Sequence, residues 1–581
     1  MPELSKQSDP VTDAEAVGEA IQEESALKAP EDDSDKEEEK PPNPSSPDAV
    51  AADAAKKKKK SKKKRVKDAI KGGSSDAAGP SGSGGGPSKA ADNKLTGNVV
   101  DQLLESNPAL KKEVSGMPKA KAEELLKSMN LSDLLTGLAV GGKNQKDMAS
   151  YKFWKTQPVP KFDEQAEVEE GPIKIIDPEK VPKEPSPLIE GFEWVTMNLM
   201  DEKEVQLADC SLCSRLTIAQ LAEVYELLNY HYVEDEEAMF RFNYSVSFLN
   251  WALKSPGWKK EWHVGVRTKQ SQKLVAFISG VPVQLRVRSK TISCAEINFL
   301  CIHKKLRSKR LAPVLIQEIT RRCYLVEVWQ AIYTAGVVLP KPVSSCRYYH
   351  RSLDWSKLND VGFSGLPPGS SRARQITKYR VPNHTSTNGI RLMQRKDSKA
   401  VLDLLRRYLA KFDMAPEFTL EEVEHWLLDQ TSSPSEQVIW AYVVEEPGTH
   451  KITDFFSFYC LESSVIKSQK HQTVRAAYLF YYASETAFEE SERGENRALK
   501  LRLNDLIADA LVLAKQLNFD VLNALTLLDN PLFLEKQKFG KGDGQLHYYL
   551  YNYRAAPLSG GLDPNGQLDE QGRSGIGMVM L

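Results

Sequence analysis

The sequence predicts a duplicated α/β fold, in which a mixed β-sheet is flanked by helices and the two halves are related by pseudo-twofold symmetry. Two observations lead to this prediction. Strand-like apolar runs alternate with amphipathic helical runs over the last two thirds of the 581-residue chain. One order of elements (strand, helix, short helix, antiparallel strands, strand, helix, strand) also occurs twice. Alternating strands and helices favour an α/β sheet, and the repeated order indicates duplication, although few residues are identical between the copies.

The first copy runs from about residue 192 to residue 336. Apolar runs with alternating or continuous character predict its strands, and apolar positions three or four residues apart predict its helices. The expected strands are 192–199, 262–268, 273–287, 293–302 and 330–336, and the expected helices are 217–232, 248–253 and 311–325. The second and third of these strands should form a hairpin, because only a short polar segment separates them.

The second copy repeats this order from residue 389. Its expected strands are 389–394, 438–446, 452–462, 474–484 and 520–527, and its expected helices are 398–412, 420–429 and 498–517. The comparison between the copies rests on the order and spacing of these elements.

Charge and composition divide the chain into four expected regions. Before Lys56 there are sixteen Asp or Glu and four Lys, and a lysine-rich block and a Gly/Ser-rich stretch follow. Residues 1–93 contain too few apolar side chains to offset the entropy of ordering, so we expect them to be disordered. Residues 95–138 have helical spacing, so we expect 94–150 to be a lead-in of short helices that is partly flexible. The two copies then occupy residues 151–357 and 358–581.

The lysine-rich block Lys56–Lys67 contains ten cations in twelve residues. Such a run can bind RNA, a ribosome or an anionic membrane, or act as a localisation signal. A solvated tail without a partner explains the same residues equally well. The sequence leaves these alternatives open.

Several functional classes are disfavoured by the sequence. No apolar run reaches the roughly 18 residues of a membrane span, and the polar, acidic start is unlike a secretory signal. The seven cysteines are sparse and odd in number, which favours a reducing, cytoplasmic location.

The CxxC at Cys210 and Cys213 lacks a second pair and the nine histidines include no HExxH, so no metal is expected. GLAVGGKN (137–144) resembles a P-loop but ends in Asn144 and follows no strand, which argues against nucleotide hydrolysis.

A dense cluster of cations follows the expected strand 293–302. Its five members lie within seven residues, directly before an apolar helix: Lys304, Lys305, Arg307, Lys309 and Arg310. The order of elements resembles the acyl-CoA-dependent N-acyltransferase fold, which holds the cofactor pyrophosphate on backbone N–H groups at this junction. The cations would then match the phosphates of coenzyme A, and a solvated loop is the alternative. The corresponding junction of the second copy, 484–500, is net acidic, which indicates that only one copy kept phosphate binding.

Several segments resemble the eukaryotic N-myristoyltransferase family. EINFLCIHKKLRSKRLAP is similar to one signature of that family, and KFGKGDGQLHYYLYNY is similar to a second. Further similar segments are YKFWKTQPVP, HYVEDEEAMFRFNYS, YTAGVVLPKPV and CRYYHRSL. The resemblance covers about residues 151–581, and the long acidic leader resembles that of fungal members.

The resemblance implies transfer of a myristoyl group from myristoyl-CoA to the α-amino group of an N-terminal glycine. The backbone N–H groups of Phe299 and Leu300 would hold the thioester oxygen, and two such donors are worth roughly 3 kcal/mol each. The peptide amine would attack directly, and Cys301 is better explained as a small core residue than as an acyl carrier. Because an amine with a pKa near 8 is mostly protonated at pH 7, a base is required, and the family uses the C-terminal carboxylate, here that of Leu581. The ending GIGMVML suits a tail that turns into a cavity, although it could also complete an apolar edge.

The resemblance also implies two sets of binding residues. Those expected to bind myristoyl-CoA, with no other cofactor, are Tyr151, Lys152, Phe153, Trp154, Phe299, Leu300, Cys301, Ile302, Arg307, Ser308, Lys309, Arg310, Leu311 and Ala312. Those expected to bind the peptide are Tyr232, Phe240, Phe242, Tyr244, Asn298, Thr334, Gly336, Tyr348, His350, Ser463, Tyr478 and Asp543. The acidic run 234–237 would favour basic residues in the substrate. Lys541, Glu462 and Tyr349 depart from the residues usual in the family and leave the detailed shape of the peptide groove open.

Two other functions fit part of the pattern. One is an acyl-CoA N-acyltransferase of the same fold that uses a different acyl group or amine. The other is a non-catalytic, ribosome- or RNA-associated protein in which the lysine-rich block is the functional part. The expected partners are myristoyl-CoA, proteins with an N-terminal glycine and, through Lys56–Lys67, a ribosome or anionic surface. We expect the chain to be a monomer.

Overall fold

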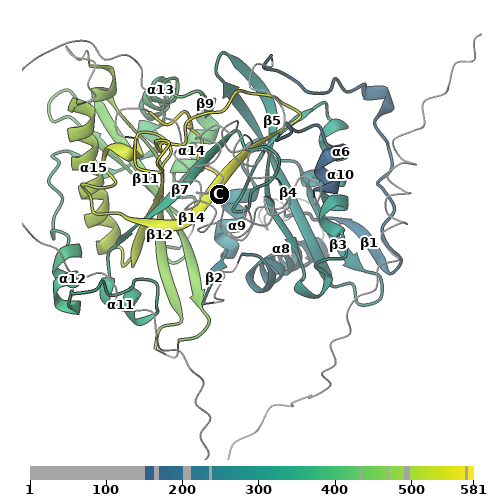
Figure 1. Ribbon diagram of the computed structural model, residues 1–581, viewed down its shortest axis with the longest axis horizontal. Helices are drawn as coiled ribbons and strands as arrows, with labels where there is room; N and C mark the ends of the chain where they lie inside the picture. The colour runs from purple at the N-terminus through teal and green to yellow at the C-terminus, as the bar shows by residue number, and fades with distance from the viewer. Residues whose placement is uncertain are drawn as a thin grey trace, which may run out of the picture. The chain divides into compact units, whose positions relative to one another are not determined.

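A fourteen-stranded mixed β-sheet forms the centre of the computed structural model (Figure 1). The structure describes residues 151–162, 169–199, 211–233, 239–431, 433–468, 470–489, 497–569 and 573–581, with the side chains of 211–219 excepted. The expected leader 1–93, the expected lead-in 94–150 and the acidic run 234–237 lie outside the described residues.

The bounds of the elements that the sequence predicted lie close to the expected ranges, and the structure adds elements that were not predicted. The strands are β1 (Phe192–Thr196), β2 (Phe240–Asn243), β3 (His263–Thr268), β4 (Leu274–Val287), β5 (Lys290–Ile302), β6 (Gln330–Ala335), β7 (Ser344–Ser352), β8 (Ile390–Leu392), β9 (Met414–Pro416), β10 (Ile439–Glu445), β11 (Ile452–Val465), β12 (Thr473–Ser484), β13 (Val521–Leu525) and β14 (Gly540–Tyr551). The helices are α6 (Lys152–Thr156), α8 (Ser211–His231), α9 (Val246–Leu253), α10 (Leu311–Tyr324), α11 (Trp355–Asp360), α12 (Arg372–Tyr379), α13 (Ser398–Leu409), α14 (Leu420–Leu427) and α15 (Arg497–Gln516). The largest difference among the predicted helices is at α8, which begins at Ser211 instead of residue 217.

The strand order contains one arrangement twice. From one edge of the sheet the first copy contributes β1-β3-β4-β5-β6, and from the other edge the second copy contributes β8-β10-β11-β12-β13. In both copies the last pair is parallel, and the pairs before it are antiparallel. The predicted duplicated α/β fold is therefore confirmed.

Strands β7 and β14 join the two copies at the centre of the sheet. β14, from the region 358–581, pairs with β6 of the first copy, and β7, from the region 151–357, pairs with β13 of the second. The two strands also pair with each other. Each copy thus receives its sixth strand from the other. The apolar pattern did not predict β7, because SSCRYYHRS is mostly polar and is held by a neighbouring strand on each side.

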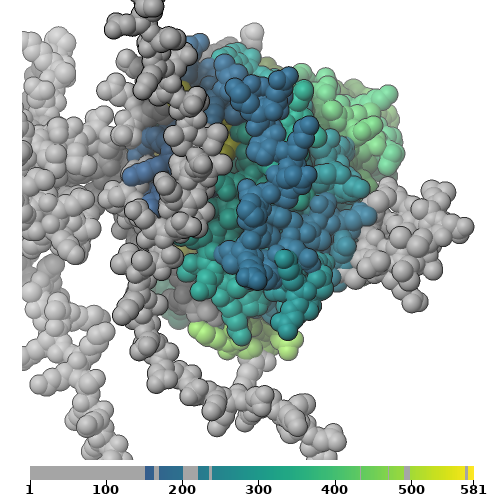
Figure 2. Space-filling model, turned by 90° about the vertical axis from the view of Figure 1, so that its right-hand side faces the viewer, coloured from purple at the N-terminus to yellow at the C-terminus, as the bar shows by residue number. Residues whose placement is uncertain are grey.

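Helices cover both faces of the first copy. α10 packs Leu315 and Ile319 against one face of β4, in a cluster that includes Ile278. On the other face Phe277 belongs to the larger core cluster, with residues of α8 and α9. Neighbouring strand residues enter different cores because side chains alternate between the two faces of a sheet. Figure 2 shows residues of the first part of the described chain, coloured blue, over much of one face of the molecule.

Within the residue ranges given above, no helix is both long enough and apolar enough to cross a bilayer.

Candidate active site

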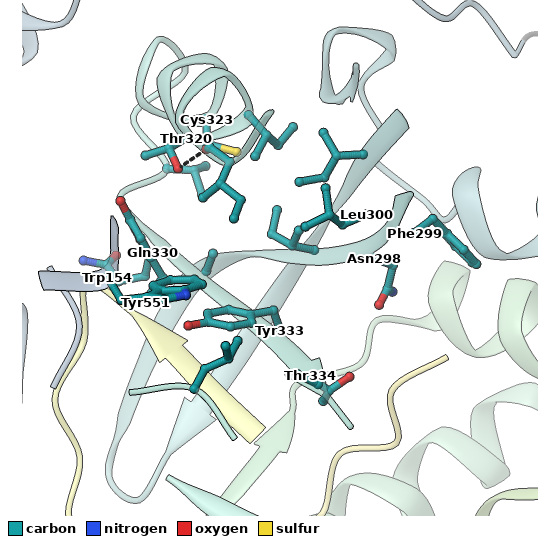
Figure 3. Close-up of a pocket in the computed structure, with 18 of the residues that line it drawn as sticks. Trp154, Asn298, Phe299, Leu300, Thr320, Cys323, Gln330, Tyr333, Thr334 and Tyr551 are labelled. Atoms are coloured by element: carbon teal, nitrogen blue, oxygen red, sulfur yellow. Dashed lines mark hydrogen bonds between the residues drawn. The ribbon is translucent and has the colours of Figure 1, made fainter. Parts of the chain in front are cut away.

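A cavity of about 330 Å³ lies where the parallel strands β5 and β6 separate (Figure 3). Their pairing ends at Ile297 and Tyr333, yet β5 continues to Ile302 and β6 to Ala335. The strand ends therefore diverge, and their residues line the cavity together with one side of α10. Most of the lining is apolar, which suits an extended hydrocarbon ligand.

A β-bulge interrupts β5 at the cavity wall. Phe299 and Leu300 together oppose the single residue Ile278 of β4, and Phe299 has a φ of 57°. A bulge turns backbone groups out of the ladder. The ring of Phe299 packs against Tyr232 and Tyr244, with centroids 6.1 and 5.4 Å away, and in Figure 3 it points away from the other labelled side chains. The ring thus anchors the bulge, while both residues contribute to the cavity wall.

The second copy has a matching bulge, and one of its amide groups is hydrogen-bonded to a side chain of the neighbouring strand. Phe480 and Tyr481 of β12 oppose the single residue Ser457 of β11. The Tyr481 amide donates to the Ser457 hydroxyl (3.2 Å), which donates to the Tyr481 carbonyl (2.7 Å). In the first copy Ile278 replaces this serine and has no polar side-chain atom. The equivalent bond therefore cannot form at Leu300.

The cation cluster forms the loop between β5 and α10. Lys304–Leu306 make a 3-10 turn, and Ser308 and Arg310 have positive φ values of 69° and 59°. Arg310 is the N-cap of α10 and makes no side-chain cap to the helix. Residues 307–310 are exposed. Uncapped amides at a helix start, next to exposed cations, provide the two features that bind phosphate groups.

Two histidines beside this loop reflect its positive potential. The rings of His231 and His303 lie 4.0 Å apart. Burial, then His303 and the neighbouring cations, lower the pKa of His231 to about 4. The pKa of His303 is lowered by burial and then by two lysines. Both rings are therefore neutral at pH 7, and the positive charge of the loop comes from Lys and Arg.

The C-terminal residues pass through the interior and reach the same cavity. Residues 576–580 are buried, and Leu581 lines the cavity together with the β5 bulge. Two buried phenols hold the tail: Tyr481 accepts a hydrogen bond from the Val579 amide (3.0 Å), and Tyr548 donates one to the Met578 carbonyl (2.9 Å).

Glycine allows the tail to pass close to its neighbours. The amide of Gly577 donates to the Met414 carbonyl at 2.7 Å. A Cβ on Gly577 would lie 3.0 Å from the Cβ atoms of Phe412 and Ala415, which is tighter than ordinary packing. A side chain at this position would therefore require the tail or these neighbours to move.

Helix α6 contributes to one side of the cavity. Trp154 lines it and stacks on Tyr333, with the centroids 5.7 Å apart and the rings 9° from parallel. Phe153 packs against Trp154 at 5.2 Å. Tyr151 donates to a main-chain carbonyl at 2.8 Å, whereas Lys152 is exposed. The structure thus brings the predicted residues 151–154 together beside the cavity.

Some of the residues predicted to bind the peptide also lie at this cavity. Asn298, Thr334 and Tyr232 line it. Phe242 and Tyr244 extend the group through ring contacts of 5.8 Å to each other and 5.6 Å from Tyr244 to Tyr232. These residues form an aromatic and polar wall next to the bulge.

A second group of the predicted peptide residues surrounds His350 on β7. Tyr348 and Phe363 flank its ring, and Phe240 contacts Phe363 at 5.8 Å. His350 Nδ1 forms a 2.7 Å hydrogen bond with Asn523 Oδ1. Burial lowers the pKa of His350, so its ring is neutral at pH 7.

Residues 542–544 of the second signature bulge out of β14 opposite Tyr348. A Cβ on Gly542 would lie 2.5 Å from His350 Nε2, so only glycine fits there. This bulge carries Asp543 next to His350, and the charge of Asp543 acts on that ring.

Three further predicted residues lie on neighbouring strands. Ser463 pairs with Phe242 where β11 meets β2. Tyr478 stacks on Tyr459 at 5.3 Å, and Gly336 directly follows β6. They extend the surroundings of the site beyond the cavity itself.

Cys301 and Ile302 were predicted along the thioester, but they do not line the cavity in the described structure. Cys301 is buried with its Sγ 3.7 Å from the Leu227 carbonyl, and burial raises the pKa of its thiol to about 12. Ile302 packs in the core cluster beneath α10. A protonated, buried thiol supports the interpretation of Cys301 as a core residue.

Sequence reasoning missed Glu296. This carboxyl is 9% exposed, accepts a 2.8 Å hydrogen bond from Asn298, and has a pKa raised to about 7 by burial. An acidic residue inside an apolar strand was the available signal, because such a group is rarely buried without a function or a partner.

Comparisons with known proteins agree with the geometry of the site. Models described as the N-terminal and C-terminal domains of myristoyl-CoA:protein N-myristoyltransferase match residues 172–346 and 360–579. Glycylpeptide N-tetradecanoyltransferase of Aspergillus fumigatus is 62% identical over 487 residues, covering 84% of this chain and 95% of that protein. The protein of the same name from Emericella nidulans is 62% identical over 489 residues, with the same two coverages of 84% and 95%. A crystal structure of Saccharomyces cerevisiae N-myristoyltransferase with bound myristoyl-CoA matches with a TM-score of 0.69 and 50% identity, over 74% of this chain and 99% of that chain.

Proposed function

The chain belongs to the myristoyl-CoA:protein N-myristoyltransferase family and transfers a myristoyl group from myristoyl-CoA to the N-terminal glycine of protein substrates, and from this premise we propose which residues perform the transfer. The observation that carries the proposal is one cavity lined by Phe299, Leu300, Thr334 and Leu581. It combines a backbone bulge, a hydroxyl and the end of the chain at a single apolar site.

The bulge of β5 acts as the oxyanion hole. The N–H groups of Phe299 and Leu300 hold the thioester oxygen while negative charge develops on it, and fixed donors of this kind contribute roughly 3 kcal/mol each. The apolar residue Ile278 opposite the bulge supports this role, since the equivalent serine of the second copy bonds the local amide.

The carboxylate of Leu581 acts as the general base. It takes a proton from the ammonium group of the substrate glycine, and the resulting amine attacks the thioester carbon directly. The C–N bond forms, the C–S bond breaks, and the electron pair of that bond leaves on sulfur. The polar side chains of Asn298 and Thr334, which line the cavity, orient the amine.

Coenzyme A binds at the start of α10. Its phosphates meet the exposed residues 307–310 and the first amides of the helix, including those of Leu311 and Ala312. The acyl chain occupies the apolar part of the cavity, where about twelve methylenes at ~0.8 kcal/mol each contribute roughly 10 kcal/mol of gross burial. The residues of α6 lie over this end of the site.

The peptide extends from the cavity along the aromatic residues of β2 and β7. His350, neutral and next to Asp543, and Ser463 on the neighbouring strand provide polar contacts along this path. A cytoplasmic location and a monomeric state are part of the proposal. The five described cysteines are all free thiols, which suits a reducing compartment.

Mass spectrometry of a peptide incubated with the chain and myristoyl-CoA tests the proposal. We expect acylation of a peptide that begins with glycine and none of the same peptide with an acetylated N-terminus. Myristoyl-CoA should also react faster than acyl-CoA molecules that are two carbons shorter or longer, since each methylene contributes about 1 to 3 kcal/mol of discrimination. Acylation of the blocked peptide, or equal rates with all three donors, would contradict the proposed roles.

A further inference from the structure

A second, smaller chamber adjoins the active-site cavity behind Leu581. Its volume is about 30 Å³, which is room for one or two water molecules. Leu581 lines both spaces. Carboxyl groups of Glu296, Glu417 and Glu422 line the smaller chamber, together with the phenol of Tyr481. The end of the chain therefore separates an apolar cavity from a chamber rich in carboxyl groups.

Glu296 is the most deeply buried of these carboxyl groups. It is 9% exposed, and its Oε1 accepts a hydrogen bond from Asn298 Nδ2 at 2.8 Å. Asn298 in turn lines the active-site cavity. The side chains of residues 296 and 298 lie on the same face of β5, because strand residues two apart share a face. Glu296 is thus linked to both spaces.

The other two glutamates and the tyrosine that line the chamber each have an identified contact. Glu422 accepts hydrogen bonds from Thr419 in the capping box of α14. Glu417 has a 40% exposed side chain and pairs with Arg286 at 2.8 Å. Tyr481 accepts a hydrogen bond from the Val579 amide, which leaves its own O–H for an acceptor.

Glu296 and Glu422 both influence this phenol. Burial raises the pKa of Tyr481 most strongly, and the charges of the two glutamates raise it further. Glu296 therefore acts electrostatically on the phenol that holds the tail, and the tail carries Leu581.

The proton balance of the reaction requires such a path. The substrate enters with an ammonium group and leaves as an amide, so nitrogen loses two protons in each turnover. The departing thiolate takes up one of them. The other must leave the site before Leu581 can act as a base again. The active-site cavity is mostly apolar and is filled by substrates during the reaction, so the chamber behind Leu581 is the better exit.

We propose that Glu296 receives this proton from the Leu581 carboxylate through the small chamber and returns it to solvent at the rim near Glu417. The inference rests on the proposed role of Leu581 as the base. Two features suit Glu296 to this transfer. It lines the small chamber and accepts a hydrogen bond from Asn298 of the active-site cavity, and burial raises its pKa to about 7, which allows it to gain and lose a proton at neutral pH.

Steady-state kinetics of Glu296→Gln and Glu296→Asp across pH 6 to 9 test the proposal, because Leu581 must lose its proton once in every turnover. We expect Glu296→Gln to slow acyl transfer about tenfold at pH 7, with the rate recovering as rising pH lets solvent take the proton. Glu296→Asp should retain most of the rate. Affinity for myristoyl-CoA should stay unchanged in both variants. Glu421→Gln is the matched control, because it makes the same substitution at an exposed position of α14 that does not line the chamber, and it should keep the wild-type profile.

Two results would overturn the proposal. One is a wild-type rate and pH profile in Glu296→Gln. The other is an equal loss at every pH together with a lower unfolding midpoint, which would make Glu296 only a structural residue. A chain extended beyond Leu581 is measured in parallel. If that chain reacts normally, the carboxylate is not the base and the proposed function fails, whatever Glu296 does.

Discussion

Leu581 and Phe299 line the same cavity, although Phe299 belongs to the first copy and Leu581 to the second. Phe299 is fixed by the bulge of β5, and Leu581 is carried there by a buried tail that passes the second copy. The active site is therefore assembled from both copies. A change to the β5 bulge or to the C-terminal tail should therefore slow acyl transfer while leaving the structure of the other element intact.

Adding residues after Leu581 should slow acyl transfer by about 10²- to 10³-fold, because the carboxylate would be replaced by a peptide group that cannot act as a base. Binding of myristoyl-CoA, measured by calorimetry, should be nearly unchanged. The control is the same extension placed at residue 1. Normal turnover of the C-terminally extended chain would rule out the carboxylate as the base.

Lys309→Glu should weaken binding of myristoyl-CoA about tenfold at physiological salt, since it reverses a charge next to the expected phosphate site. The difference from wild type should shrink as salt is raised, because exposed charges are screened. Lys399→Glu, an equally exposed change on α13, is the matched control. If both variants bind myristoyl-CoA equally well, the cation cluster does not hold the phosphates.

Gly577→Ala should destabilise the fold by about 1 to 3 kcal/mol and slow turnover, because the added methyl group would press on Phe412 and Ala415. Denaturant unfolding measures the first effect and single-turnover kinetics the second. Gly365→Ala is the control, since a Cβ there meets nothing within 4 Å. Equal stability of the two variants would show that the tail has room to move.

His263 should make the protein less stable in mild acid. Its ring is fully buried against Trp258, and burial lowers its pKa from 6.5 to about 4. Between these two values the unfolded chain binds a proton that the folded chain excludes, so stability falls as pH falls. The linkage amounts to about 2 kcal/mol between pH 7 and pH 5. Urea unfolding at both values should show a smaller loss in His263→Gln, and an identical loss would contradict the expectation.

Deleting residues 1–93 should leave turnover of a glycine-initiated peptide unchanged in vitro, because the proposed catalytic and binding residues all lie beyond residue 150. Steady-state kinetics of the shortened and full chains make the comparison. A ribosome- or RNA-associated function would instead depend on Lys56–Lys67. Loss of turnover on deletion would assign the leader a part in the reaction itself.

Most of the sheet could be predicted from local pattern. The apolar periods of β3, β4, β5 and α10 are strong because each has at least one face in a core. The position of β7 could not be predicted in this way. Its polar residues acquire a buried environment only when β13 and β14 pair on either side, and such long-range pairing has no local signature.

The residues of the site could be predicted only where they belong to a recognisable sequence motif. The cation cluster was found from its charge density after a strand, whereas the residues around Phe299 were found from the signature segments, and several of the latter line the cavity. The bulge itself depends on the register between β4 and β5, which one strand alone does not specify. Likewise, the hydrogen bond from Tyr481 to Ser457 becomes visible only when β11 and β12 are paired. The contrast between the two copies is therefore a property of tertiary structure.

The exchange of β7 and β14 has a consequence for biosynthesis. During translation, β6 emerges about two hundred residues before Gly540–Tyr551, the strand that pairs with it. Until then its open edge can pair with other chains, which is a common route to aggregation. The sheet of the first copy therefore keeps an unpaired edge at β6 until β14 has been synthesised. A growing polypeptide of this kind should need protection by chaperones until synthesis is nearly finished.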